Sequence, residues 1–368
     1  MWLKHLQLIN FKNYAELNLD FSPNINCFLG DNGQGKTNLL DAIHYLAFCK
    51  SYFNPIDAQL VKKEETFFML QGDFERDDKS DNIYCGYKKG QKKQFKRNKK
   101  LYEKLSEHIG LIPLVMISPS DSELIHEGSE RRRRFLDLII SQFDKEYLNH
   151  LIQYNRALSQ RNRLLKKFME VRRFDEEALQ IWDEQLINYG VPISNARRSF
   201  LERFIPLFQK QYEHISERKE KLDLKYLPSY EKGEFKEALI NARDKDRRNT
   251  YTTVGIHKDD IAFEIEDYPL KKFGSQGQQK TFLLGLKLAQ AEILKDIKSV
   301  APILLLDDIY DKLDDKRVAA LMEIVQADWF GQVFISDTHT DRLPKIFESI
   351  DVDYNRFIIK EGEHQNDE

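Results

Sequence analysis

A glycine-rich stretch near the N-terminus constrains the fold more than any other part of the sequence. The segment GDNGQGKT, Gly30–Thr37, matches the pattern G-x-x-x-x-G-K-[ST] in full. The apolar run NINCFLG precedes it, and TNLLDAIHYLAF, with apolar residues at helical spacing, follows it. Glycines let successive backbone N–H groups turn toward phosphate oxygens, and the N-terminus of the helix adds a favourable field. The segment therefore predicts a strand–loop–helix unit that binds ATP.

Two side chains of this loop have specific predicted roles. Lys36 is expected to reach the β- and γ-phosphates, and the Thr37 hydroxyl is expected to ligate Mg²⁺. The other loop residues expected to contact the nucleotide are Gly30, Asp31, Asn32, Gly33, Gln34, Gly35 and Asn38.

An apolar run far downstream ends in two carboxylates. The segment PILLLDD covers Pro302–Asp308 and has the character of a buried strand. Asp307 is expected to hold the metal directly or through water, and Asp308 to polarise the attacking water as the catalytic residue. A strand followed by a helix N-cap would also explain the two carboxylates taken alone.

A second Gly/Gln-rich stretch lies shortly before that acidic strand. The pattern Ser-x-Gly-Gln, Ser275–Gln278, opens a helix. It is typical of transport-type and chromosome-associated ATPases, in which it contacts the γ-phosphate held by a second subunit; P-loop kinases and small GTPases lack it. Ser275, Gly277 and Gln278 are therefore expected to complete the nucleotide site of another copy. The segment DKLD, Asp311–Asp314, matches the next motif of that class, and an ordinary capped helix start is the alternative for Ser275–Gln278.

The order of patterns along the 368 residues predicts two domains of an α/β protein. Strand-like patterns precede and follow a turn near Lys12–Tyr14. Further strand-like patterns run from 66 to 118 and indicate a β-rich lobe. The last hundred residues alternate helix and apolar strand, which is typical of a parallel sheet. We expect an ABC/Rad50-type P-loop ATPase head at 1–120 and 250–368, with a helical arm domain inserted at 121–249. The arm is predicted to consist of antiparallel helices, interrupted at Gly190–Pro192 and Pro206.

Charge is unevenly distributed, although the net charge is only -3. The basic run Lys88–Lys104 alternates enough to form a hairpin whose lysines could bind DNA phosphates without reading sequence. The candidate DNA contacts are Lys92, Lys93, Lys96, Arg97 and Lys99. A solvated charged face explains this run equally well. The run Arg131–Arg134 opens a helix, where cations oppose the dipole, so it indicates a DNA or domain contact or else a solvated turn.

Targeting and cysteine patterns indicate a cytoplasmic, nucleoid-associated protein without a membrane partner. No apolar run is long enough to span a bilayer, and the N-terminus lacks the pattern of a signal peptide. Cys27, Cys49 and Cys85 show no metal or redox spacing.

Taken together, these motifs resemble the RecF family of bacterial recombinational-repair ATPases, within the SMC and Rad50-like group, over essentially the whole chain. The distinctive segments are GDNGQGKTNLLDAIHYLAFCKS, ISPSDSELIHEGSERRRRFLDLII, TTVGIHKDD, GSQGQQKTFLLGLKLAQ, LLLDDIYDKLD and QVFISDT. The resemblance implies an ATP-dependent homodimer that binds duplex DNA next to single-strand gaps, promotes recombinase loading and works with RecR and RecO. It also implies weak DNA-stimulated ATP hydrolysis that resets a clamp. The head ATPase of another SMC/Rad50-like or ABC-type complex is the alternative.

The resemblance also assigns residues and shows departures. It implies that Lys12 and Asn13 contact the nucleotide, although a plain turn between strands explains the pair equally well. Ile256 replaces the proline that usually precedes His257. After the strand QVFIS, where related ATPases place a switch histidine, this chain has Asp337, with His339 two residues later, so neither is assigned as the γ-phosphate sensor.

Overall fold

The computed structural model describes residues 1–76, 79–216, 220–231, 233–308, 330–339, 347 and 353–365. The chain divides into two compact units. Unit 1 comprises Met1–Asp121, His214–Glu217 and Lys280–Glu368, and unit 2 comprises Ser122–Glu213 and Arg218–Gln279. The predicted motif at Asp311–Asp314 lies outside the described residues.

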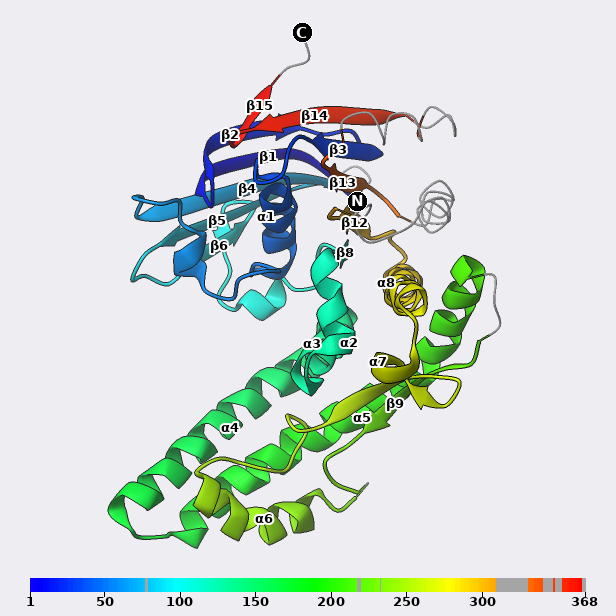
Figure 1. Ribbon diagram of the computed structural model, residues 1–368. Helices are drawn as coiled ribbons and strands as arrows, with labels where there is room; N and C mark the ends of the chain where they lie inside the picture. The colour runs from blue at the N-terminus through cyan, green and yellow to red at the C-terminus, as the bar shows by residue number, and fades with distance from the viewer. Residues whose placement is uncertain are drawn as a thin grey trace. The chain divides into compact units, whose positions relative to one another are not determined.

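The first sheet of unit 1 is antiparallel and has the strand order β2-β1-β4-β5-β6-β7 (Figure 1). Side chains on β1 and β4 alternate between buried and more exposed, as expected for strands that cover a core on one face. The turn between β1 and β2 falls at Lys12–Asn13, as the sequence predicts. The strands are β1 Trp2–Phe11, β2 Tyr14–Asp20, β4 Phe67–Arg76, β5 Lys79–Lys88, β6 Gln94–Arg97 and β7 Lys100–Leu101.

The second sheet of unit 1 carries the predicted parallel arrangement, with the order β15-β14-β3-β13-β12-β8. Only β15, which pairs with β14, is antiparallel among its described strands. The carboxyl ends of β3, β12 and β13 therefore meet at one edge, where ligands of open α/β sheets bind. The strands are β3 Ile25–Leu29, β8 Leu114–Ile117, β12 Ile303–Leu306, β13 Val333–Asp337, β14 Tyr354–Lys360 and β15 Glu363–Gln365.

The strand β8 corrects one sequence prediction. The pattern analysis placed it in the β-rich lobe, but β8 pairs in parallel with β12. Its run Leu-Val-Met-Ile is apolar on successive residues, and its first three residues are buried. A strand covered on both faces needs such a run, because a sheet in a parallel α/β arrangement is buried on both sides.

Within the described part of unit 1, two α-helices, α1 and α8, pack in its interior. Helix α1, Lys36–Phe48, is buried along most of its length and lies against β4, β5, β8 and β13, so both sheets contact it (Figure 1). Helix α8, Gln276–Lys298, begins in residues that belong to unit 2 and continues through unit 1. Short 3-10 helices occupy Asp57–Leu60, Leu105–Glu107 and Pro119–Ser122.

Unit 2 is mainly helical and includes a small antiparallel sheet with the order β11-β10-β9. Its helices are α2 Glu123–His126, α3 Ser129–Phe143, α4 Lys145–Val171, α5 Glu176–Ser216 (whose last residues count with unit 1), α6 Phe235–Asn249 and α7 Leu270–Phe273. Its strands are β9 Leu222–Leu227, β10 Asp260–Ile265 and β11 Tyr268–Pro269. Residues 250–279, expected in the ATPase head, belong to unit 2 because β10 pairs with β9 and packs on α3.

Helix α5 differs from the interrupted pattern that the sequence predicts. It runs from Glu176 to Ser216 with Pro192 and Pro206 inside it. A proline in a helix interior costs about 3 kcal/mol because it removes one backbone hydrogen bond and crowds the preceding turn. Ile193, Phe204 and other apolar residues of α5 are almost fully buried, and this burial outweighs the local penalty.

None of the described helices combines the length and apolar character needed to cross a membrane.

A buried ion cluster joins three helices of unit 2. Arg161 of α4 donates to Asp183 of α5 at 2.7 Å and to Asp246 of α6 at 2.6 Å. Thr252 also accepts from Arg161, at 2.9 Å. The Arg161 and Asp246 side chains are fully buried, so each charge depends on its partners for compensation.

Replacing Asp246 by alanine should destabilise unit 2 by about 3 kcal/mol, because it leaves Arg161 partly uncompensated in the interior. Urea unfolding followed by Trp182 fluorescence measures the stability of unit 2, because Trp182 is the one tryptophan in the sequence of that unit. The two tryptophans outside unit 2, Trp2 and Trp329, are first changed to phenylalanine in every variant. With a slope of about 2 kcal/mol/M the midpoint falls by roughly 1.5 M. Asp244→Ala, an exposed position on the same helix, is the control and should change stability by less than about 0.5 kcal/mol. Equal midpoints for the two variants would contradict the role of the cluster.

Candidate nucleotide-binding site

The loop Gly30–Gly35 connects β3 to α1 and needs glycine at three positions. The φ angles of Gly30, Gly33 and Gly35 are 146°, 82° and 117°, in the region that other residues rarely adopt. A Cβ atom on Gly30 would lie 2.3 Å from the carbonyl oxygen of Ile359, and one on Gly35 would lie 2.4 Å from Asn13 Nδ2. The glycines therefore allow both the backbone turn and the close approach of neighbouring segments.

Two turns from distant parts of the chain hold this loop in place. Asn13 Nδ2 donates to the carbonyl of Gln34 at 3.1 Å, and Asn13 Oδ1 accepts from Asn38 Nδ2 at 2.7 Å. The Tyr14 hydroxyl donates to the carbonyl of Gly35 at 2.9 Å. From the turn between β14 and β15, the Gly362 N–H donates to the carbonyl of Gln34 at 3.1 Å. Of these contacts the sequence pointed only to Asn13.

Lys36 directs its ammonium group into the loop. Its Nζ donates to the carbonyl oxygens of Gly30 and Asp31 at 2.6 and 2.8 Å. Burial lowers the pKa of Lys36, and the carboxylates of Asp308 and Asp307 oppose that shift. A buried cation whose hydrogen bonds in the described structure go to neutral carbonyls favours an anion such as a phosphate group.

Thr37 and Asp307, the predicted metal ligands, lie together. Thr37 Oγ1 donates to Asp307 Oδ1 at 2.8 Å, across 270 residues of sequence. Ser336 Oγ donates to the same oxygen at 2.9 Å and accepts from the Asp308 N–H at 3.0 Å. Burial raises the pKa of Asp307, while the hydrogen bonds from Thr37 and Ser336 lower it in part. A hydroxyl next to a carboxylate suits Mg²⁺, which binds oxygen ligands and keeps several waters. Ser336 was not among the predicted site residues, although it lies in the segment QVFISDT.

Asp337 and Asp308 complete the acidic edge of this site. Asp337 is 1% exposed, and among the described residues its Oδ2 atom has no hydrogen-bond partner. Its Oδ1 atom accepts from the His339 N–H at 3.1 Å. Asp308 has a φ of 48°, a strained value for an aspartate, of the kind that clusters at functional sites. A buried carboxylate oxygen without a donor fits a site that holds a cation or its bound water.

Lys12 takes a different position from that of Asn13. Its Nζ pairs with Asp41 Oδ2 of α1 at 2.6 Å, and the Asp41 side chain is fully buried. The Lys12 ammonium also lies 5.7 Å from the centre of the Phe11 ring. Lys12 thus fastens the turn between β1 and β2 to α1, while Asn13 reaches the phosphate loop itself.

The segment Ser275–Gln278 forms a capping box at the start of α8. Ser275 Oγ accepts from the Gln278 N–H at 3.2 Å, and Gln278 Oε1 accepts from the Ser275 N–H at 2.7 Å. Gln278 Nε2 also donates to Glu220 at 2.9 Å. The Ser275 residue is exposed. Two of the three residues expected to contact a second copy therefore also cap their own helix, and Gly277 lies between them.

The basic hairpin of β5, β6 and β7 divides into partnered and exposed cations. Lys93 pairs with Asp57 at 3.0 Å and donates to the carbonyl of Cys49 at 2.6 Å. Arg97 contacts both carboxylate oxygens of Asp81, at 2.7 and 2.8 Å. Burial raises the pKa of Asp81, and the hydrogen bonds and charge of Arg97 outweigh it, so the net shift is downward. Arg97 stays exposed in this ion pair, and Lys96 Nζ lies 5.2 Å from the centre of the Tyr84 ring. Lys92, Lys96 and Lys99 are the candidates for which the described structure shows no carboxylate partner.

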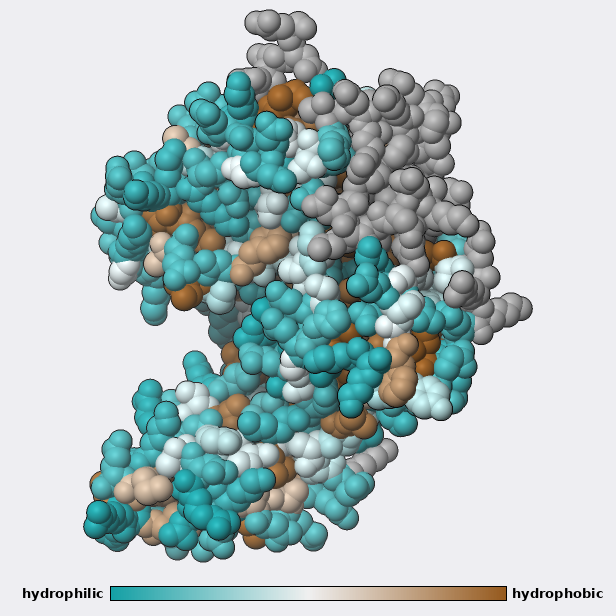
Figure 2. Space-filling model, in the orientation of Figure 1, coloured by the Kyte–Doolittle hydropathy of each residue, from teal (hydrophilic) through white to brown (hydrophobic). Residues whose placement is uncertain are grey.

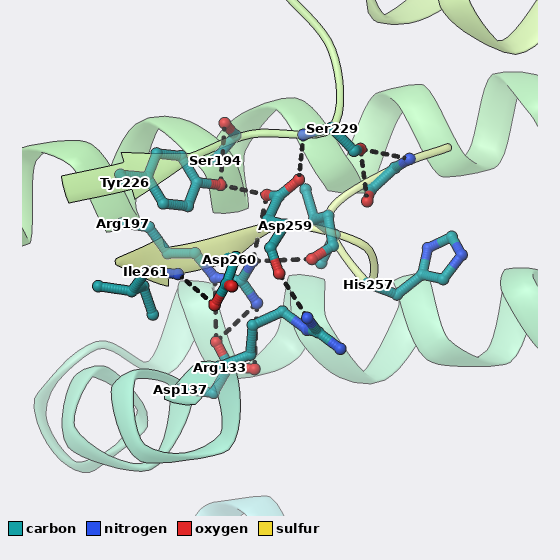
Figure 3. Close-up of polar contacts among 12 residues, drawn as sticks. Arg133, Asp137, Ser194, Arg197, Tyr226, Ser229, His257, Asp259, Asp260 and Ile261 are labelled. Atoms are coloured by element: carbon teal, nitrogen blue, oxygen red, sulfur yellow. Dashed lines mark hydrogen bonds and ion pairs between the residues drawn. The ribbon is translucent and has the colours of Figure 1, made fainter. Parts of the chain in front are cut away.

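The arginine run Arg131–Arg134 is held within unit 2. Arg131 pairs with Glu123 and Glu127, and Arg134 with Glu130. Arg132 contacts both oxygens of Asp260 at 2.8 and 3.0 Å. Arg133 donates to the carbonyl of Asp259, as Figure 3 shows. The run therefore joins α3 to the segment GIHKDD.

The segment GIHKDD forms a junction in which Gly255, Ile256 and Asp259 are buried and Lys258 is exposed (Figure 3). Arg197 donates to Asp137 at 2.8 Å and to the carbonyl of Ile256 at 3.0 Å. His257 Nδ1 lies 2.8 Å from the Tyr154 hydroxyl, and burial lowers the pKa of His257 to about 4. Ile256 is 1% exposed, so its apolar side chain replaces the usual proline by packing in the core.

The phosphate loop, the acidic strand and a second Gly/Gln segment in a split α/β fold define the chain as a P-loop ATPase head of the SMC and Rad50 type. An SMC head domain bound to the C-terminal winged-helix domain of ScpA shares this fold, with a TM-score of 0.56 at 15% identity over 99% of this chain and 96% of that chain. Residues 2–356 match the family described as RecF/RecN/SMC N terminal domain.

Full-length relatives narrow this class. The chain is 50% identical over 365 residues to the DNA replication and repair protein RecF of Phocaeicola vulgatus, covering 99% of this chain and 98% of the relative. It is 51% identical over 359 residues to the protein of the same name from Flavobacterium johnsoniae, covering 98% and 100%. A solved structure of the recombination mediator protein RecF-ATP in the RecFOR pathway matches with a TM-score of 0.89 at 34% identity, covering 99% of this chain and 97% of that chain. The chain belongs to the RecF family.

Replacing Gly35 by alanine should lower the affinity for a fluorescent ATP analogue by about 5- to 150-fold. The new Cβ meets Asn13 and Tyr14 at a φ of 117°, so the loop must move at a cost of about 1–3 kcal/mol. Gly90→Asn is the matched control, because a Cβ there meets no atom within 4 Å, the position lies outside the phosphate loop, and asparagine tolerates a positive φ. Titration by fluorescence anisotropy measures both, and equal loss in the two variants would show that the contacts of Gly35 are unimportant.

Proposed function

We propose that this chain is an ATP-dependent DNA-binding protein that dimerises on ATP binding and acts in recombinational repair and replication restart. The observation that carries the proposal is the grouping of Lys36, Thr37, Asp307 and Ser336 at the edge of the parallel sheet. The relatives named for DNA replication and repair, and the related structure named RecF-ATP, support it.

ATP and Mg²⁺ fit the residues of this edge. The glycine loop Gly30–Gly35 and Lys36 hold the phosphates, and Thr37 and Asp307 hold the metal. When bound, Mg²⁺ neutralises charge on the phosphates. Asp308 orients the water for a weak, DNA-stimulated hydrolysis, and Asn13 keeps the loop in position by its contacts to Gln34 and Asn38. Lys12 supports the same loop indirectly, through Asp41 and the turn that carries Asn13.

The second Gly/Gln segment supports an ATP-dependent homodimer. Ser275 is exposed at the N-terminus of the long helix α8, where backbone N–H groups favour an anion. In the proposed dimer Ser275, Gly277 and Gln278 of one copy contact the γ-phosphate held by Lys36 of the other copy. Binding of nucleotide then joins two copies, and hydrolysis releases them.

Ser275→Asp should abolish ATP-dependent dimerisation while ATP binding to the monomer is kept. Aspartate caps a helix as well as serine does, so α8 keeps its start, but its charge repels a phosphate held by another copy. Ser275→Asn is the matched control, because asparagine also caps the helix and is neutral. Sedimentation velocity with ATP and Mg²⁺ measures the dimer. If Ser275→Asp forms an ATP-dependent dimer as stable as that of the wild-type chain, the proposed contact is wrong. If the wild-type chain does not bind ATP at all, the proposed function itself is wrong.

We further propose that the hairpin cations bind the backbone of duplex DNA at gap junctions, independently of sequence. Lys92, Lys96 and Lys99 remain exposed at least in part, and each neutralised phosphate releases counterions. Lys93 and Arg97 act by holding the hairpin through Asp57 and Asp81. Recombinase loading, cooperation with RecR and RecO, and a nucleoid-associated location complete the proposal, and membership of the RecF family supports them.

Changing Lys92, Lys96 and Lys99 together to glutamate should weaken duplex binding and reduce the slope of log affinity against log salt by about 2–3, or ~0.9 for each phosphate contact. Fluorescence anisotropy with a gapped duplex at several salt concentrations gives this slope. The control changes Lys63, Lys236 and Lys245, three exposed lysines elsewhere, to glutamate, so that the net charge is the same. If both triple variants keep the wild-type slope, the hairpin is a solvated face only.

A further inference from the structure

Unit 2 contains a hollow of about 540 Å³ where α4 ends and α6 runs alongside it. Leu165, Phe168 and Met169 of α4 line it, together with Phe174 in the connection to α5. Arg172 ends α4 in a left-handed conformation with a φ of 52°, which turns the chain around the hollow. This volume lies within the range of small-ligand and peptide-anchor pockets, about 300–1,000 Å³.

Arginines surround this hollow, and most of them are uncompensated. Arg172, Arg173 and Arg248 are exposed, and within the described parts of the chain no carboxylate lies at ion-pair distance from any of them. Arg247 has one carboxylate near it, Asp244, at 3.6 Å. The residues that line the hollow thus include four arginines but one aspartate, so the lining carries a net positive charge. Guanidinium groups in this state favour carboxylates, which they bind with paired hydrogen bonds.

The floor of the hollow is apolar. Leu165 is buried, and the rings of Phe168 and Phe174 meet edge to face with their centres 5.2 Å apart. Met169 is 53% exposed beside them, and a methionine adapts its shape to an incoming apolar group. Figure 2 shows hydrophobic residues interspersed with hydrophilic ones over this end of unit 2, where α4, α5 and α6 come together in Figure 1.

Nucleic acid fits this hollow less well than a peptide does. The Arg247 guanidinium lies 4.2 Å from the centre of the Phe174 ring and covers that face, which a base would need for stacking. The adjoining carboxylates Glu170, Asp175 and Glu177 are exposed and interrupt the basic surface that a phosphate backbone would follow. Charge is therefore concentrated at one point, as suits a short acidic segment.

We propose that this hollow is a docking site for a segment of another protein in which two or more carboxylates flank an apolar or aromatic side chain. The apolar side chain enters between Met169 and the phenylalanines, and the carboxylates pair with Arg172, Arg173 and Arg248. Neither the phosphate loop nor the segment Ser275–Gln278 takes part, so this site stands whether or not the proposed ATP-dependent dimer forms.

Fluorescence anisotropy with a labelled peptide Asp-Asp-Asp-Phe-Asp-Asp tests the site on the full-length chain. The double variant Arg173→Glu/Arg248→Glu should lower its affinity at least tenfold, and Met169→Glu should lower it comparably. Arg163→Glu is the matched control, because Arg163 is exposed on α4 and does not line the hollow. Peptides with asparagine in place of aspartate, or serine in place of phenylalanine, should each bind at least tenfold more weakly than the acidic aromatic peptide.

Binding of a fluorescent ATP analogue, unchanged in every variant, verifies that the chain is folded. The proposal is wrong if the double variant binds the acidic peptide as the wild-type chain does, or if the serine peptide binds equally well. It is also wrong if labelled single-stranded or duplex DNA, rather than the peptide, loses affinity in the double variant and not in Arg163→Glu, since the arginines then bind phosphates.

Discussion

The hydrogen bond between Thr37 and Asp307 is the contact on which the candidate nucleotide site of unit 1 is built. It joins the start of α1 to the end of β12, two segments 270 residues apart. The parallel order β3-β13-β12 makes this possible, because the carboxyl ends of these strands lie at one edge. Ser336, at the end of the strand between them, contacts the same carboxylate. One hydroxyl–carboxylate group thus aligns three strands and the helix that follows the phosphate loop.

Buried charge at this edge explains why the site suits a nucleotide and a cation. Burial lowers the pKa of Lys36 and raises that of Asp307, so both groups are held in surroundings that disfavour their charged forms. Asp337 adds a buried carboxylate oxygen without a donor among the described residues. In the proposed function, a phosphate group and Mg²⁺ would supply the opposite charges that these groups need. The loop is kept in shape meanwhile by neutral contacts from Asn13, Tyr14 and Gly362.

Five arginines of unit 2 lie in three different physical environments. The sequence alone does not show which environment each arginine has. Arg161 and Arg197 are buried and compensated by aspartates, and they join helices. Arg132 is part of a run that fastens α3 to the segment GIHKDD, where a DNA contact was one hypothesis. Arg173 and Arg248 are exposed around an apolar floor without a carboxylate partner in the described structure. Of these five arginines, only Arg173 and Arg248 are exposed and lack a carboxylate partner among the described residues.

The sequence alone determined the phosphate loop, the acidic strand, the cap of α8 and the alternation of strands and helices. These features depend on glycine geometry, helix capping and hydrophobic periodicity, which act within a few residues. The contacts of Tyr14 and Ser336, the place of β8 in the parallel sheet and the continuity of α5 through Pro192 were decided by tertiary structure. So were the partners of Lys93 and Arg97, which fasten the hairpin instead of lying free. Each of these depends on which distant segments share a core or an ion pair, and a long-range contact of this kind outweighs the local preference of the residues that make it.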